Sequence, residues 1–153
     1  MNSLVVIRVG EPDNFFYNQM ERGVWSTADS QHVRNAFVQG RSVFVVFVGS
    51  DDTPLYIGRV SNVRPRNVIS DAAFPNTHTT FFVFQPIIIS YPVSHVFSDL
   101  LARIHFETGV QLVIADLQIV STVIAFYHGL YQGRNTIPLN YYINRENVNY
   151  IPH

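Results

Sequence analysis

The chain of 153 residues contains no lysine and no cysteine, and it has a single tryptophan, Trp25. Without cysteine it forms neither disulfides nor thiolate metal ligands, which suits an intracellular protein, and we expect a cytoplasmic rather than a nuclear location. The longest apolar run, Val43–Val48, is far too short to cross a bilayer. The first residues show no basic region followed by a cleavage site, so we expect no secretory signal.

The lack of lysine means that all ten cationic side chains are arginines, and the net charge is only −1. A net charge near zero argues against a generic polyanion binder, which is normally basic. Arginine, however, offers a planar fork for phosphates and stacks on bases, so this small charge is well suited to nucleic acid. A chain without lysine also offers ubiquitin no side-chain acceptor, as would suit a short-lived or foreign protein.

Signatures of catalysis and metal binding are also missing. The six histidines show neither HxxxH nor HxH spacing, and no GxGxxG, Walker or GxSxG motif is present. The carboxylate pair Asp51–Asp52 lies in a predicted turn, where aspartate is common for conformational reasons. We therefore expect no enzyme, no metal and no cofactor.

The pattern of apolar residues predicts one mixed α/β domain over residues 1–153, with the tail 135–153 unassigned. Strands are predicted at Ser3–Val9, Ser42–Val48, Leu55–Val60, Thr80–Ile89 and Gln111–Ile114. Helices are predicted at Phe15–Arg22, Ser30–Val38, Val96–Arg103 and Ile119–Tyr131. Gly23 should end the first helix, and Asp29 or Ser30 should cap the second. Pro86 should mark a strand edge or a bulge.

The sequence around the tryptophan carries the most specific motif, Gly-Val-Trp-Ser-Thr at Gly23–Thr27. Together with the segments that flank it, this motif resembles the core of the YTH domain. The further matching segments are Val5–Arg8, Asn35–Phe37, Arg41–Phe47, Gly58–Arg59, "TTFFVFQPI" and "ADLQIV". Only Gly23–Gly58 is specific to the family.

The resemblance implies a YTH/PUA-like fold, a twisted mixed β-barrel with helices packed around it. It also implies a non-catalytic monomer that binds N6-methyladenosine in single-stranded RNA through an aromatic cage. Trp25, Ser26 and Thr27 would then lie in the base pocket, with the indole face stacking on the base and the Ser26 carbonyl accepting its N6–H. An indole is the widest stacking surface among side chains, and stacking of one base is worth about 1–3 kcal/mol.

Other positions follow from the same resemblance. Asn14, with Asp13 as the alternative, matches a polar side chain that contacts the adenine ring nitrogens. Arg8 and Asp116 match residues near the RNA, although the arginine that precedes the acidic residue in the family is Ala115 here.

Two arginines, Arg64 and Arg66, flank Pro65 and so lie on a stiffened basic loop. They are predicted to contact phosphates, with plain solvent exposure as the alternative.

The second wall of the cage is the largest departure from the family. YTH domains supply a second tryptophan from the loop before the "TTFFVF" strand, and this chain has none. Within Asn67–His78 the available surfaces are Phe74, Ile69 and His78, and Phe74 is the best candidate because it is the only aromatic carbocycle there. The alternative is that Phe74 fills the core beneath a shortened loop.

Two other functions stay open at this point. One is an EVE-like reader of modified bases in DNA. The other is a degenerate YTH domain that acts as a protein-interaction module. The intact Trp25–Thr27 segment favours the two readers, whereas the missing second tryptophan favours the interaction module.

Overall fold

A computed structural model of the chain describes residues 2–89, 94, 98–99, 101, 112–114 and 117–133. The elements follow in the order β1 (Asn2–Gly10), α1 (Asn14–Arg22), β2 (Val24–Trp25), α2 (Gln31–Val38), β3 (Ser42–Gly49), β4 (Pro54–Pro65), β5 (Thr80–Ile88), β6 (Leu112–Ile114) and α4 (Leu117–Tyr131). Most of the predicted helix Val96–Arg103 lies outside the described residues, as do Asp116 and the tail 135–153.

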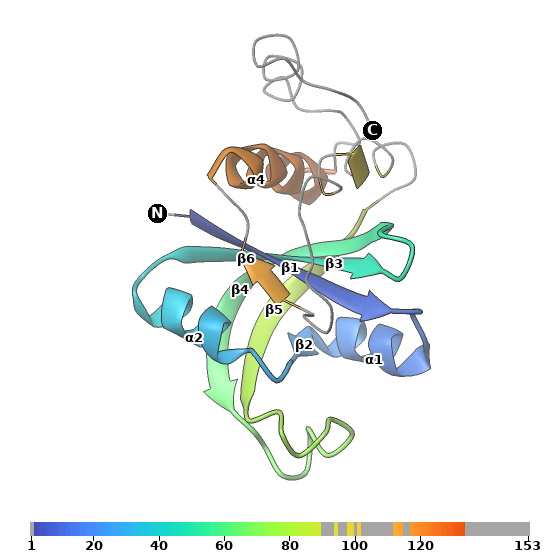
Figure 1. Cartoon of the computed structure of the whole chain (residues 1–153), viewed down its shortest axis with the longest axis vertical. Helices are drawn as coiled ribbons and strands as arrows, with labels where there is room; N and C mark the ends of the chain where they lie inside the picture. Colours follow the sequence, from blue (N-terminus) through green and yellow to red (C-terminus); the bar gives the residue numbers. More distant parts are fainter. Residues whose placement is uncertain are drawn as a thin grey trace, which may run out of the picture.

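The strands form one sheet in the order β2-β5-β4-β3-β1-β6 (Figure 1). β1 and β3 are parallel, and every other neighbouring pair is antiparallel. The predicted mixed α/β fold is confirmed. The predicted closure into a barrel is wrong: no pairing among the described residues joins β2 to β6. These two end strands contain only two and three residues, which leaves too little backbone to close the sheet.

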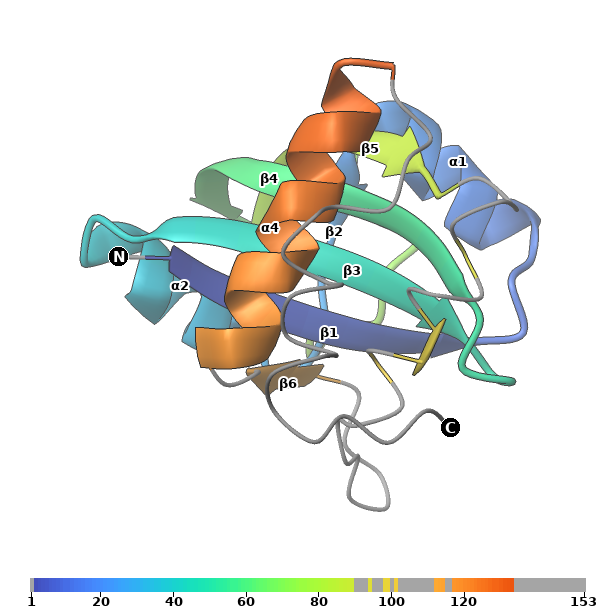
Figure 2. The same ribbon diagram turned by 90° about the horizontal axis from the view of Figure 1, so that it is seen from above.

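Helices cover both faces of the sheet, with α4 on one face and α1 and α2 on the other (Figures 1 and 2). Successive strand side chains point to opposite faces. In β1, Leu4 and Val6 therefore join the cluster with α4, whereas Val5 and Ile7 join the cluster with α1 and α2. Burial on both faces explains why β1 and β3 are continuous apolar runs rather than alternating ones.

The end of α1 positions the tryptophan segment. Gly23 ends the helix as predicted, with a left-handed φ of 68°, and its backbone N–H donates to Met20 at 3.1 Å. A Cβ at this position would lie 2.3 Å from the carbonyl oxygen of Phe84, so only glycine fits there. The Phe84 N–H donates to the Gly23 carbonyl at 2.9 Å. This close contact aligns β2 on β5.

The β3–β4 hairpin is confirmed, although β4 continues to Pro65, beyond its predicted end. The ladder between β4 and β5 is irregular between Val60 and Asn62, which makes Ser61 an extra residue on β4. Pro86 pairs with Gly58 and lies beyond the two residues of β5 that pair with β2. None of the helices in the described ranges is both long and apolar enough to span a bilayer.

Candidate nucleic-acid interface

Trp25 lies on β2, opposite Phe82 of β5, and its side chain is half-buried. Four phenylalanine rings have centroids within 6 Å of the indole; the distances are 5.8 Å for Phe15, 5.7 Å for Phe16, 5.9 Å for Phe47 and 5.4 Å for Phe74. We call these five residues the Trp25 cluster. Three of the four rings meet the indole edge to face, an arrangement that aromatic pairs favour. The tryptophan is therefore anchored in the fold on several sides.

Phe74 closes one side of this cluster. Its side chain is only 3% exposed, and its ring stands at 79° to the indole. A base held between two parallel rings needs them about 7 Å apart, because each stacked contact takes about 3.5 Å. In the observed arrangement the two rings are too close and too steeply inclined to sandwich a base. A base can enter between them only after Phe74 turns away.

Two buried polar atoms of residues that contact Phe74 have no hydrogen-bond partner among the described residues. They are Nε1 of Trp25 and Nδ1 of His78, whose rings both contact that of Phe74. Burial and the charge of Arg66 lower the pKa of His78, and a hydrogen bond with the backbone of Ser26 opposes them. Because buried polar groups normally have partners, these atoms favour a polar ligand beside Phe74.

Ser26 and Thr27 are buried and use their polar groups within the protein. The Ser26 hydroxyl donates to the Thr80 carbonyl at 2.5 Å. The Thr27 N–H donates to the Ser30 hydroxyl at 2.7 Å, and the Thr27 hydroxyl accepts from Asp29 N–H at 3.1 Å. These bonds tie the residues after Trp25 to β5 and to the start of α2. Both side chains therefore position the tryptophan segment.

The start of α1 brings the predicted adenine contacts to the same region. The Asp13 carboxylate caps the helix by accepting from Phe16 N–H at 2.8 Å. Asn14 is the exposed first residue of the helix, and Phe15 and Phe16, which follow it, belong to the Trp25 cluster. The structure thus places both polar candidates within three residues of rings that contact the indole.

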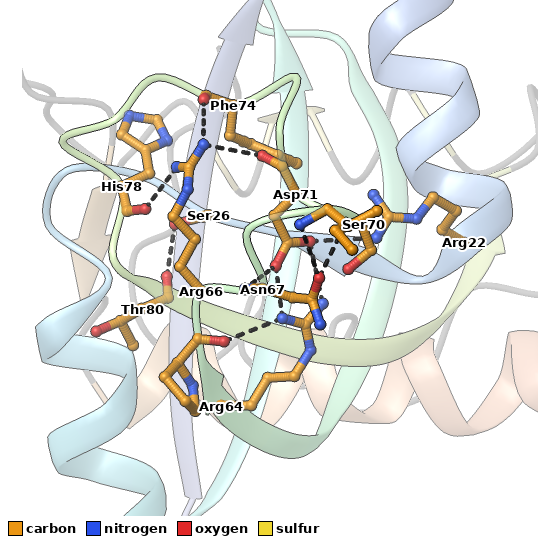
Figure 3. A network of polar contacts seen from close by, with 12 residues as sticks. Arg22, Ser26, Arg64, Arg66, Asn67, Ser70, Asp71, Phe74, His78 and Thr80 are labelled. Atoms are coloured by element: carbon orange, nitrogen blue, oxygen red, sulfur yellow. Dashed lines mark hydrogen bonds and ion pairs between the residues drawn. The ribbon is translucent and has the colours of Figure 1, made fainter.

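The loop between β4 and β5 is built around Asp71, whose side chain is 0% exposed (Figure 3). The carboxylate accepts from Arg64 at 2.6 and 3.1 Å, from Arg22 at 3.2 Å and from Asn67 N–H at 2.8 Å. Burial acts to raise the pKa of Asp71, but these hydrogen bonds outweigh it and hold the pKa at about 2. Asp71 is not among the site residues predicted from the sequence.

Arg66 completes the loop (Figure 3). Its guanidinium donates to four backbone carbonyls of the loop, those of Pro75 at 2.7 Å, Phe74 at 2.8 Å, His78 at 3.0 Å and Asp71 at 3.1 Å. Arg64 donates instead to the side-chain carboxylate of Asp71, through both of its terminal nitrogens. Each guanidinium would have to give up these bonds to meet a phosphate. The loop that carries Phe74 and His78 is therefore held in shape by the two arginines predicted to bind RNA.

The remaining predicted residues are spread over the surface. Ile69 is 88% exposed at the outside of the loop, in a turn where its N–H donates to the Asn67 side chain at 2.9 Å. Arg8 forms an ion pair with Asp52, which lies in the β3–β4 turn with a left-handed φ of 63°. Asp116 lies outside the described residues. Those described include no group of three or more His, Asp or Glu side chains arranged to hold a metal ion.

No family model and no curated protein matches the chain. Among solved structures it is similar to the Mmi1 YTH domain, with a TM-score of 0.60 and 12% identity over 87% of this chain and 100% of that one. It is also similar to the Toxoplasma CPSF4 YTH domain, with a TM-score of 0.60 and 12% identity over 86% and 88% of the two chains. A third is the Pho92 YTH domain in complex with m6A, with a TM-score of 0.59 and 11% identity over 82% and 86%. The resemblance seen in the sequence is confirmed for the fold.

Proposed function

We propose that this chain, which has the fold of the YTH domains, binds RNA without catalysis and recognises N6-methylated adenosine beside Trp25. The observation that carries the proposal is the position of Trp25 in the Trp25–Thr27 segment: its indole, on β2, is surrounded by four phenylalanine rings. Two structural neighbours support it, because the Pho92 YTH domain was solved with m6A and the Mmi1 YTH domain with RNA.

Binding in this arrangement requires a change at Phe74. When that ring turns out of the cluster, the indole gains an open face, and stacking on it is worth about 1–3 kcal/mol. Burial of the methyl carbon adds roughly 0.8 kcal/mol. The Ser26 carbonyl is the proposed acceptor for the N6–H. The proposed second wall is formed by the displaced Phe74 and by His78, whose Nδ1 has no hydrogen-bond partner among the described residues.

The test compares methylated and unmethylated RNA of one sequence, titrated by fluorescence anisotropy against the wild type and Trp25→Phe. Phenylalanine keeps most of the packing in the cluster but removes the wide face and the indole N–H. We expect Trp25→Phe to bind methylated RNA about tenfold more weakly, which corresponds to about 1.4 kcal/mol of lost stacking. Tyr17→Phe is the matched control, because Tyr17 is exposed and contacts Phe16 but not the indole.

Two results would contradict the proposal. If the wild type binds both RNAs equally, it does not read the methyl group. If methylated DNA of the same sequence binds more tightly than methylated RNA, the domain is a reader of modified DNA. The melting temperature of each variant, measured alongside, separates a lost contact from a lost fold.

A further inference from the structure

Two hollows lie end to end along β4, on either side of Phe37 of α2. One has a volume of about 720 Å³ and lies against α4, with Arg59, Tyr127, His128 and Tyr131 on its walls. The other has a volume of about 440 Å³ and lies between α2 and the end of β4, with Arg34 and Thr80 on its walls. Phe37 lines both hollows. We refer to the two together as the β4 trough.

The charge of the β4 trough is positive. No aspartate or glutamate of the described residues lines either hollow, whereas three arginines do. Arg34 and Arg59 form no ion pair with any residue that the structure describes. Arg59 donates to the Ser42 hydroxyl at 3.0 Å, and its guanidinium lies over the ring of Phe44, 5.8 Å from the centroid. The third arginine, Arg64, shares the single carboxylate of Asp71 with Arg22, so its charge is not fully neutralised.

Aromatic faces accompany these cations. Tyr131 is 63% exposed, and its ring lies 5.9 Å from that of Tyr127 with the planes only 30° apart. Phe37 is half-buried at the junction of the two hollows. Grooves that bind single-stranded nucleic acid combine these two features, cations along the backbone and rings on which bases stack. A groove for an acidic peptide would share the charge but would have no need of the exposed rings.

The β4 trough begins next to the Trp25 segment. Thr80 lines its smaller hollow, and the carbonyl of this residue accepts the hydrogen bond from the Ser26 hydroxyl at 2.5 Å. We propose that the β4 trough binds the single-stranded RNA that flanks the base held beside Trp25. This proposal rests on the proposed function for its starting point, and it extends the RNA contact from that base to the last turn of α4.

The test measures how affinity depends on RNA length. A short RNA covers the methylated base and its immediate neighbours, and a longer one adds a single-stranded extension at either end. We expect the longer RNA to bind the wild type about tenfold more tightly, roughly the effect of one stacked base. The variant Arg34→Gln/Arg59→Gln/Tyr131→Ala should lose this gain and bind the short RNA as the wild type does. Arg34→Gln alone, which changes an exposed side chain, should lose part of the gain.

Arg41→Gln is the matched control, because Arg41 donates to the Ser3 hydroxyl and lies outside the β4 trough. If the folded triple variant still binds the longer RNA more tightly than the short one by the same factor as the wild type, the proposal is overturned. The absence of any gain in the wild type would also overturn it and would favour a peptide as the occupant. The same length series with unmethylated RNA keeps the two proposals apart: lost methyl preference contradicts the Trp25 assignment, whereas a lost length effect contradicts the β4 trough.

Discussion

The loop between β4 and β5 and the β4 trough both contain arginines, yet the two regions use them differently. Arg64 at the end of β4 belongs to both, Arg66 belongs to the loop, and Arg59 of β4 and Arg34 of α2 belong to the trough. In the loop, Arg64 and Arg66 face a buried carboxylate and four carbonyl oxygens, and their donors are taken up inside the protein. In the β4 trough, Arg59 and Arg34 face no carboxylate of the described residues. The acceptor opposite the guanidinium, rather than the spacing of the arginines, decides whether it supports the fold or is available to a ligand.

This difference also separates two kinds of electrostatic contribution. A guanidinium bound to a fully buried carboxylate is shielded from salt and contributes to stability. An arginine on the wall of an open groove contributes little to stability, but it attracts phosphate and its effect falls as salt rises. Each of the following changes tests one side of this comparison.

The largest effect should come from Asp71→Asn. The amide cannot accept from both Arg22 and Arg64 as the carboxylate does, and it presents an N–H₂ group to other donors. Breaking a buried ion pair costs about 3–5 kcal/mol, and because both arginines are partly exposed we expect about 3 kcal/mol of lost unfolding free energy. Urea denaturation measures this loss. Asp29→Asn, at an exposed carboxylate in the turn before α2, is the control and should change little; equal effects would mean that Asp71 does not organise the loop.

The next effect is on the pH dependence of stability. The pKa of Asp71 is about 2 in the folded protein, whereas an aspartate without partners, as in the unfolded chain, has a pKa of 3.8. As the pH falls, the unfolded chain therefore binds the proton first. The ionised carboxylate therefore contributes about 2 kcal/mol to the free energy of unfolding above about pH 4, and this contribution is lost as the pH falls from about 4 to about 2. Urea midpoints across this range should fall more steeply for the wild type than for Asp71→Asn. Parallel curves would contradict this assignment.

A smaller difference in stability should separate the replacement of Arg66 from that of Arg34. Replacing Arg66 by glutamine removes donors from four carbonyls, and we expect a loss of about 1–2 kcal/mol in stability. Arg34→Gln should stay within about 0.5 kcal/mol of the wild type. The order should reverse for RNA, where Arg34→Gln lowers the slope of log affinity against log salt by about one. Thermal unfolding and salt titration on the same two proteins measure both quantities; a salt effect confined to Arg66→Gln would reverse our comparison.

Local sequence signals predicted most of the elements because the signals are themselves local. Apolar runs marked β1, β3 and β5, and Gly23 marked the end of α1, since a left-handed residue is needed there. The open sheet was not predicted, because closure depends on pairing between its first and last strands, which no short window of sequence contains.

The candidate site was predictable only in part. The motif at Gly23–Thr27 marked the position of Trp25, but the inclination of Phe74 against it depends on packing between distant segments. Asp71 looked like an ordinary loop aspartate. One hint of its role was that a lone acidic residue follows Arg64 and Arg66 closely in the chain, but the contact with Arg22 depends on a segment far away in the sequence.

The parallel pairing of β1 with β3 has a consequence for the order of folding. Asn2 pairs with Ser42, so the stretch that contains α1, β2 and α2 lies within the loop that this pairing closes. Loop-closure entropy is lost before such a contact forms, which makes parallel pairs slow to assemble. Trp25 can pair only with Phe82 of β5, which lies later in the chain than both parallel strands. The side of the indole segment that pairs with β5 therefore stays uncovered until the chain beyond both parallel strands is available.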